Sequence, residues 1–345
     1  METISKIFNH QLDPRTHGTT DRLVDDRVFV GLELELEQMA HLVPMNLRST
    51  LVQSNFWRYH YDDSLRDCGT ELIMAIPTGE PLRGADIIEA LEVLREVLDT
   101  WKAVSGRTPA ISKRTSTHVH IDVRDFDIEQ IQRYAMLWVV FEEVLFNWSA
   151  PKRARNNYSR SAMEFPDVEE QFGQLFDLSP GHPGNMYHFI NENGRKYDAL
   201  NLYSMVNLGT LEFRAMGGCY DPDRLLEWIN ILLSMRQAAK DSDLSLQDIP
   251  EQMSAVGIES VLYTVFKDYA DLLRPFAPRH VLLRGVRRMQ GLLTRKAYSA
   301  INRELSSSKS GKADNPYLLN FKKKTISSLK AKAMAATETT SEEKV

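Results

Sequence analysis

The chain has 345 residues, of which 43% are apolar and 26% charged, an ordinary balance for a globular protein. Its net charge of −5 excludes a general electrostatic attraction to nucleic acid or to anionic membranes. No apolar run approaches the roughly 18 residues that cross a bilayer, and two cysteines are too few for a disulfide framework. We therefore expect a cytoplasmic protein that binds neither nucleic acid nor membrane.

The first half of the chain predicts a sheet with helices between its strands. After a polar leader, alternating apolar and polar residues predict strands within 28–37, 55–64, 69–77 and 116–123. An apolar stripe predicts a helix over 85–102, and Asp127 can cap a second helix. The stretch from about 150 to 197 shows no clear period, which predicts a long functional loop.

The second half predicts a hairpin followed by helices. Two strands within 199–216 are expected to join through a turn near Asn207 and Gly209, and Asp221 with Pro222 predicts a helix that ends near 240. Two more helices are expected within 258–305, broken at Pro275 and Pro278. These elements predict four parts: a leader (1–27), a catalytic domain (28–240), a helical extension (241–305) and a flexible tail (306–345).

Acidic and imidazole groups alternate along several predicted strands. The groups that share a strand face are Glu33, Glu35 and Glu37 on the first, Glu71 on the third, His118, His120 and Asp122 on the fourth, and Glu212 with Arg214 on the last. Each strand alone is also typical of a solvated surface. If the strands form one sheet, the groups converge, and that many carboxylates require cations. Oxygen-rich ligands favour Mg²⁺ or Mn²⁺ over zinc.

Two features indicate an anionic ligand beside the carboxylates. Arg214 lies among the predicted metal ligands, and a guanidinium there favours an anion, such as phosphate, that bridges it to a metal. Further basic residues occur in the loop, at Lys152, Arg153, Arg155 and Arg160, although a solvated basic loop is an equal alternative. No Gly-rich GxxxxGK[ST] nucleotide loop is present.

Taken together and in order, six motifs resemble the putative amidoligase family, a branch of the carboxylate-amine ligases related to glutamine synthetase and glutamate-cysteine ligase. The motifs are GLELE (31–35), DDSL with GTELI (62–65 and 69–73), THVHID (117–122), RARNNY (153–158), ALNL (199–202) and TLEFR (210–214). The resemblance covers roughly residues 28–240. It implies a glutamine-synthetase-like α+β fold, in which a mostly antiparallel sheet curves around the active site and helices pack behind it. It also implies ATP and two or more Mg²⁺ (or Mn²⁺) ions.

The resemblance also implies a role for individual residues. The metal ligands it implies are Glu33, Glu35, Glu71, His120 and Glu212. Arg214 matches the arginine that binds the transferring phosphoryl group, and the resemblance implies that Arg214 and Arg153 are catalytic. Arg153, Asn156 and Tyr158 match positions that bind substrate or phosphate, and Asn201 is implied, with Arg214, to bind the cofactor. It leaves open whether His118 is a ligand or structural. Ser116 and Thr117 stand where the family commonly has a glycine-containing turn, so the backbone there is expected to differ.

The expected activity is that of an ATP-dependent carboxylate-amine ligase, which forms an amide through an acyl phosphate. Its partners would be a small-molecule or peptide carboxylate and an amine, and an oligomer is compatible with the sequence. Two alternatives stay open: a metal-dependent hydrolase that uses His118, His120 and the glutamates, and a non-catalytic binding module. A hydrolase would need metal without ATP, whereas a module would bind neither tightly.

Overall fold

A computed structural model describes residues 2–11, 15–38, 45–66, 69–179, 182, 184–241 and 258–308. Its contacts divide the chain into two units, residues 1–296 and 297–345. Of the second unit, the described part is residues 297–308, the end of a helix, so nearly all of the predicted tail lies outside the described residues. Among the described helices, none combines the length and the hydrophobicity that a membrane crossing requires.

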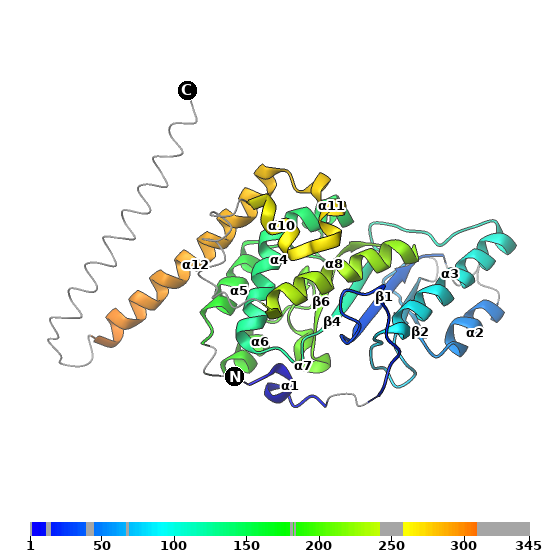
Figure 1. The fold of residues 1–345 in the computed structure, drawn as a ribbon, viewed down its shortest axis with the longest axis horizontal. Coiled ribbons are helices and arrows are strands. Elements are labelled where there is room, and N and C mark those ends of the chain that lie inside the picture. Colours follow the sequence, from blue (N-terminus) through cyan, green and yellow to red (C-terminus); the bar gives the residue numbers. More distant parts are fainter. Residues whose placement is uncertain are drawn as a thin grey trace, which may run out of the picture. The chain divides into compact units, whose positions relative to one another are not determined.

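The first unit is an α+β structure built on a six-stranded antiparallel sheet (Figure 1). Its strand order is β2-β3-β1-β4-β6-β5, so β1 and β4 lie at the centre. The strands are β1 (Val30–Leu36), β2 (Trp57–Tyr61), β3 (Thr70–Met74), β4 (Ser116–Asp122), β5 (Leu200–Asn201) and β6 (Thr210–Gly217). The predicted strands of the first half are thus confirmed. The four strands that carry the predicted charged residues lie next to one another in the order β3-β1-β4-β6.

Helices follow the strands in the predicted places and extend the fold toward the C-terminus. The helices before β5 are α1 (Ile4–Ile7), α2 (Met45–Gln53), α3 (Ala85–Ser105), α4 (Ile128–Ser149), the 3-10 helix η1 (Pro151–Arg155), α5 (Pro166–Asp177) and α6 (Gly184–Asn193). Those after it are α7 (Ser204–Leu208), α8 (Pro222–Asp241), α10 (Ile258–Phe266), η2 (Lys267–Tyr269), α11 (Ala270–Leu273), η3 (Arg274–Phe276) and α12 (Arg279–Ser308). The predicted caps are confirmed: Asp127 forms a capping box with Gln130, and Asp221 Oδ1 accepts from the Asp223 amide.

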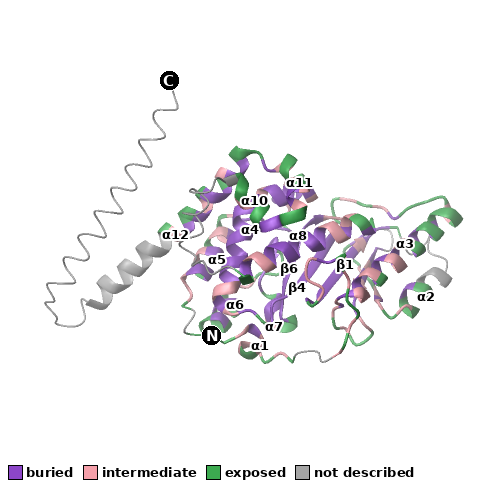
Figure 2. Cartoon of the chain, viewed as in Figure 1, coloured by how far each residue is buried: buried purple, intermediate pink, exposed green. Residues whose placement is uncertain are grey.

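The sheet has one apolar and one charged face, because side chains alternate along each strand. Leu32, Leu34 and Leu36 are fully buried in the core. On β6, the ring of Phe213 lies 5.4 Å from Tyr134 and 5.2 Å from Trp138, both on α4. Figure 2 shows the buried residues concentrated in the sheet and in α4 and α8. The helices therefore cover the apolar face, and the intervening polar residues of β1 and β6 project from the other.

The prediction of an irregular loop over 150–197 is wrong. This stretch contains η1, α5 and α6, and the apolar residues of α5 recur at helical spacing, so Val168, Phe172 and Leu175 are buried. Gln132 of α4 donates to the carbonyl of Leu175 at 2.9 Å and fixes the end of α5. The glycines and prolines between the helices obscured this short apolar stripe.

Two further predictions need correction. The predicted hairpin within 199–216 has a two-residue β5, and its connection is the helix α7, which ends at Gly209 with φ 68°, a left-handed conformation that favours glycine. The C-terminal region is divided more finely than two helices: η2 separates α10 from α11, and η3 separates α11 from α12 at the predicted break near Pro275 and Pro278.

A fully buried carboxyl group on α4 connects this helix to the segment before α5. Glu142 accepts from the backbone amides of Ala162 and Met163 at 3.1 and 3.2 Å, and from Trp138 Nε1 at 3.2 Å. Burial raises the pKa of Glu142 from its ordinary value of 4.5 to about 7, despite these donors. The folded state therefore holds this proton at pH values where the unfolded chain has lost it.

This difference predicts a pH dependence of stability. Because the folded pKa is the higher one, the contribution of Glu142 to the free energy of unfolding falls as pH rises from about 4.5 through about 7, by roughly 2–4 kcal/mol. Denaturant unfolding of the wild type and of Glu142→Gln between pH 5 and 8 should give a smaller pH dependence in the variant. Equal pH dependence in the two proteins would contradict the buried carboxyl as its source.

Close packing of α12 on α4 gives a second prediction. A Cβ at Gly285 would collide with the carbonyl oxygen of Val140, whereas a Cβ at Gly291, on the same helix, would meet nothing within 4 Å. Gly285→Ala should lower the free energy of unfolding by about 1–3 kcal/mol through overpacking. The matched Gly291→Ala should raise it by up to about 1 kcal/mol through helix propensity. Equal effects of the two substitutions in denaturant titrations would disprove the close contact.

Candidate active site

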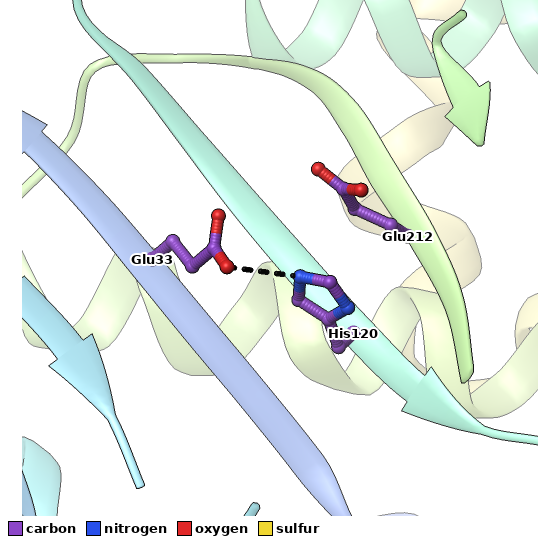
Figure 3. A group of neighbouring side chains, drawn as sticks. All are labelled: Glu33, His120 and Glu212. Atoms are coloured by element: carbon purple, nitrogen blue, oxygen red, sulfur yellow. Dashed lines mark ion pairs between the residues drawn. The ribbon is translucent and has the colours of Figure 1, made fainter. Parts of the chain in front are cut away.

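The strand register places the predicted glutamates and histidines side by side on the charged face of the sheet. Across β1 and β4, Glu33 is paired with His118, and across β4 and β6, His120 is paired with Glu212. Figure 3 shows Glu33, His120 and Glu212 projecting from three neighbouring strands toward one another. Residues up to 179 positions apart in sequence are therefore neighbours because the sheet aligns them.

Glu33 is the centre of this cluster because it contacts both imidazoles. Its Oε2 lies 3.0 Å from His118 Nδ1, and its Oε1 lies 3.3 Å from His120 Nε2. The other nitrogen of each ring has its own hydroxyl partner: Ser116 Oγ lies 2.8 Å from His118 Nε2, and Thr210 Oγ1 lies 3.1 Å from His120 Nδ1. These contacts orient both rings toward the carboxylate.

A glycine gives His120 the room that this arrangement needs. Gly31 is the β1 residue paired with His120, and a Cβ added to it would lie 3.2 Å from the Cβ of His120. Any larger residue would press on the histidine. The glycine of the GLELE motif is thus explained by close approach across the strands.

Glu212 is held by a buried set of donors. Arg214 Nη1 and Asn201 Nδ2 donate to its two oxygens, and Ser204 Oγ donates to Oε2 at 3.0 Å. Arg214 Nη1 also lies 3.3 Å from His118 Nδ1, so the guanidinium contacts both the carboxylate and the imidazole cluster. Asn201 is 2% exposed. The predicted cofactor-binding Asn201 therefore positions Glu212 in this structure.

Two overlapping sets of ligand atoms are close enough to hold a metal ion. One is Glu33, His120 and Glu212, and the other is Glu33, Glu71 and His118; within each set the ligand atoms lie within 4.8 Å of one another. His120 Nε2 is buried and has no aligned hydrogen-bond partner among the described residues. It therefore points a potential ligand atom at two carboxylates without being satisfied by either.

The ionisation of the cluster reflects crowding of like charges. Burial alone would raise the pKa of Glu33, but the hydrogen bond with His118 and the neighbouring imidazoles of His118 and His120 lower it well below its usual range. Burial and then repulsion by Glu33 and Glu35 raise the pKa of Glu71 to about 7. For His120, burial lowers the pKa, but Glu33 outweighs it and raises the pKa above its usual value. Glu71 is therefore the carboxylate that holds a proton up to about pH 7 unless a bound cation neutralises the charge of its neighbours.

A cavity of about 520 Å³ opens over this face. Among the described residues, its wall includes the acidic groups Glu33, Glu35, Asp62 and Glu71, the cations Lys113, Arg114, Lys196 and Arg214, and also Ser64, Ser116, His118, Asn156, Tyr158 and Tyr197. The rings of Tyr158 and Tyr197 meet edge to face at 5.4 Å. This volume suits a small molecule, with acidic groups at the sheet and cations around them.

The predicted residues of the RARNNY segment lie in different places. Asn156 and Tyr158 line the cavity, and Tyr158 is 60% exposed. Arg153 is buried, and its Nη1 donates to the carbonyl of Thr115, the residue before the central strand β4, at 3.0 Å. Burial lowers its pKa to about 10. Arg153 contacts backbone rather than the cavity wall, so its predicted roles in catalysis and in binding substrate have no direct contact to support them here.

Other residues of the predicted charged face belong elsewhere. Asp122 ends β4 and pairs with Arg124 at 2.9 Å, so the structure does not bring it into the cluster. Glu37 is buried and accepts from the Arg66 amide. Glu35 is connected to the cluster by Ser116, whose Oγ donates a hydrogen bond to the Glu35 carboxylate. Ser116 replaces the expected glycine-containing turn with a strand residue that contacts both Glu35 and His118.

Several residues at the site were not found from the sequence. Ser116 alternates with His118 and His120, and this period could have identified it. Thr210 and Ser204 carry no comparable signal, because their roles depend on contacts across strands. The cations Lys113, Arg114 and Lys196 come from segments outside the strands, which the alternation of strand residues cannot reveal.

Comparison with known proteins supports the assignment suggested by the motifs. Residues 69–235 match a protein-family model described as "Putative amidoligase enzyme". Over this segment the chain is similar to the putative amidoligase family. The matched segment is a little under half of the chain. It includes Glu71, His118, His120, Glu212 and Arg214 but begins after β1, which carries Glu33 and Glu35. No curated protein compared with the chain matches it. The amidoligase family points to an enzyme that forms amide bonds, a ligase.

The hydrogen bonds to Glu212 predict the effect of removing one of its neutral donors, the side-chain amide of Asn201. Asn201→Ala should lower the free energy of unfolding by about 1–3 kcal/mol, because the buried carboxylate loses a hydrogen bond. Asn156→Ala, at the cavity rim, should change it by less than about 0.5 kcal/mol. Denaturant titration measures both. A small effect of Asn201→Ala would indicate that this side chain is not required to hold Glu212.

Proposed function

We propose that the chain is an ATP-dependent carboxylate-amine ligase with a glutamine-synthetase-like catalytic domain. The observation that carries the proposal is the convergence of Glu33, Glu71, His120 and Glu212 beside Arg214 on one sheet face, within a family of amidoligases. The proposal assigns the acidic groups to metal ions and the arginine to the phosphoryl group that is transferred.

The donor set fits divalent cations. The buried and unsatisfied His120 Nε2, and the crowding that keeps Glu71 protonated to about pH 7, are both relieved by a positive ion. The residues that would hold Mg²⁺ or Mn²⁺ are Glu33, Glu35, Glu71, His120 and Glu212, with His118 available as a further ligand. Bound metal ions would neutralise the phosphate oxygens of ATP.

Arg214 would stabilise the charge that develops on the transferring phosphoryl group. Its side chain is 6% exposed, and contacts of the guanidinium to Glu212 and to the Tyr158 carbonyl, 3.2 Å away, fix its direction. A preoriented cation in a site shielded from water lowers the barrier more than one that must reorganise. Lys113, Arg114 and Lys196 at the rim would attract the anionic substrates.

The reaction would proceed in two steps. A substrate carboxylate oxygen attacks the γ-phosphorus of ATP, the bond to ADP breaks, and an acyl phosphate forms. The amine nitrogen then attacks the acyl carbon, the bond to phosphate breaks, and the nitrogen loses a proton to leave the amide. The acyl phosphate also reacts with water, so residues such as Tyr158 and Tyr197 above the site would shield it.

Thermal unfolding with Mg²⁺, with ATP and with both tests the proposal. Ligands that bind only the folded state raise its unfolding temperature, and we expect the largest rise with both present. Glu71→Gln should remove most of the joint effect, whereas Glu89→Gln, the same change on an exposed position of α3, should preserve it. The Glu71 variant should also lose amine-dependent ADP formation by at least about tenfold.

The alternatives predict different results. A rise with metal alone, equal with and without ATP, would support a metal-dependent hydrolase and overturn the ligase. No response to any of the three additions would favour a binding module.

A further inference from the structure

A second cavity, of about 610 Å³, lies between α4, η1 and α12. The charged residues that line it are Glu143 of α4, Lys152 and Arg155 of η1, Glu164, and Arg284 and Arg288 of α12. None of these residues lines the sheet-face cavity described above. We call this second cavity the η1 groove.

The η1 groove has an excess of positive charge. Four cations face two carboxylates, and the pairs Arg155–Glu164 and Arg284–Glu143 satisfy one cation for each carboxylate. Lys152 has no ion-pair partner within the described part of the chain, and the buried Nη1 of Arg288 has no hydrogen-bond partner there. A desolvated guanidinium nitrogen without an acceptor costs free energy, which an anion in the groove would recover.

The chemistry of the groove selects its ligand. Arginine presents planar N–H groups that match the oxygens of phosphate, and a net charge of +2 balances a dianion. Phe146, Pro151 and Met163 add apolar surface beside these charges. The volume lies within the range of small-molecule sites. We propose that the η1 groove binds a small phosphate-bearing molecule through Arg288 and Lys152.

The groove is also connected to the sheet face. Lys152 and Arg155 of η1 line the groove, while Arg153, between them, donates to the carbonyl of Thr115, the residue before β4. Movement of η1 on anion binding would therefore reach the strand that carries His118 and His120. The segment η1 thus contacts both the groove and the residue that leads into β4.

Calorimetric titration of the full chain with pyrophosphate, without Mg²⁺ or ATP, tests the site. Arg288→Gln should weaken binding by at least about tenfold, since it removes a charged hydrogen bond. Arg287→Gln is the matched control, because Arg287 is the adjacent, exposed residue of α12 and does not line the groove. Lys152→Gln, a change to an exposed side chain that should not affect folding, should weaken binding as well.

Two results would overturn the proposal. Equal weakening by Arg288→Gln and Arg287→Gln would show a nonspecific response to charge. Binding that survives Arg288→Gln and Lys152→Gln but is lost in Arg214→Gln would assign the anion to the sheet face. Because the titration contains neither metal nor ATP, failure here leaves the ligase proposal untouched.

A further titration distinguishes the source of the phosphate. Phenyl phosphate should bind more tightly than inorganic phosphate if the apolar wall takes part, and Arg288→Gln should weaken both. Equal binding of the two would assign the groove to free phosphate and leave the apolar wall without a role.

Discussion

The contact of Glu33 with two histidines is the constraint on which the candidate site depends. A carboxylate at the centre of a sheet, beside Glu35 and Glu71, is repelled by its neighbours and desolvated by burial. The imidazoles of His118 and His120 offset both effects, because each places a nitrogen within 3.3 Å of Glu33. Hydroxyl groups behind the rings then fix their direction. The cluster is preorganised by hydrogen bonds that leave His120 Nε2 unsatisfied, and this is the strongest structural argument for a cation.

The charged face can exist because the opposite face supplies the core. Alternation along β1 buries Leu32 and Leu34 while it projects Glu33, and on β6 it packs Phe213 against α4 while Glu212 and Arg214 face the site. The helices α4 and α8 thus stabilise strands whose other sides carry unfavourable charge. Substitutions in this core would change the position of the ligands without contacting them.

The basic residues of the short helix η1 contact two different parts of the molecule. Its residues divide between an outward groove, through Lys152 and Arg155, and an inward contact of Arg153 to β4. A basic segment therefore serves two surfaces, because a 3-10 turn points successive side chains in different directions. This division is what makes a separate anion site compatible with the catalytic proposal.

The sequence by itself determined the strands β1, β3, β4 and β6, the caps of α4 and α8, and the set of charged residues, because periodicity and capping are local properties. It also predicted the family. It did not reveal α5, α6 and α7, whose short apolar stripes lie among glycines and prolines. Only the tertiary structure decided that Asp122 pairs with Arg124, that Asn201 holds Glu212 and that Arg153 donates to the carbonyl of Thr115. These outcomes depend on register and packing between distant segments, and no local pattern encodes which neighbour satisfies a buried polar group.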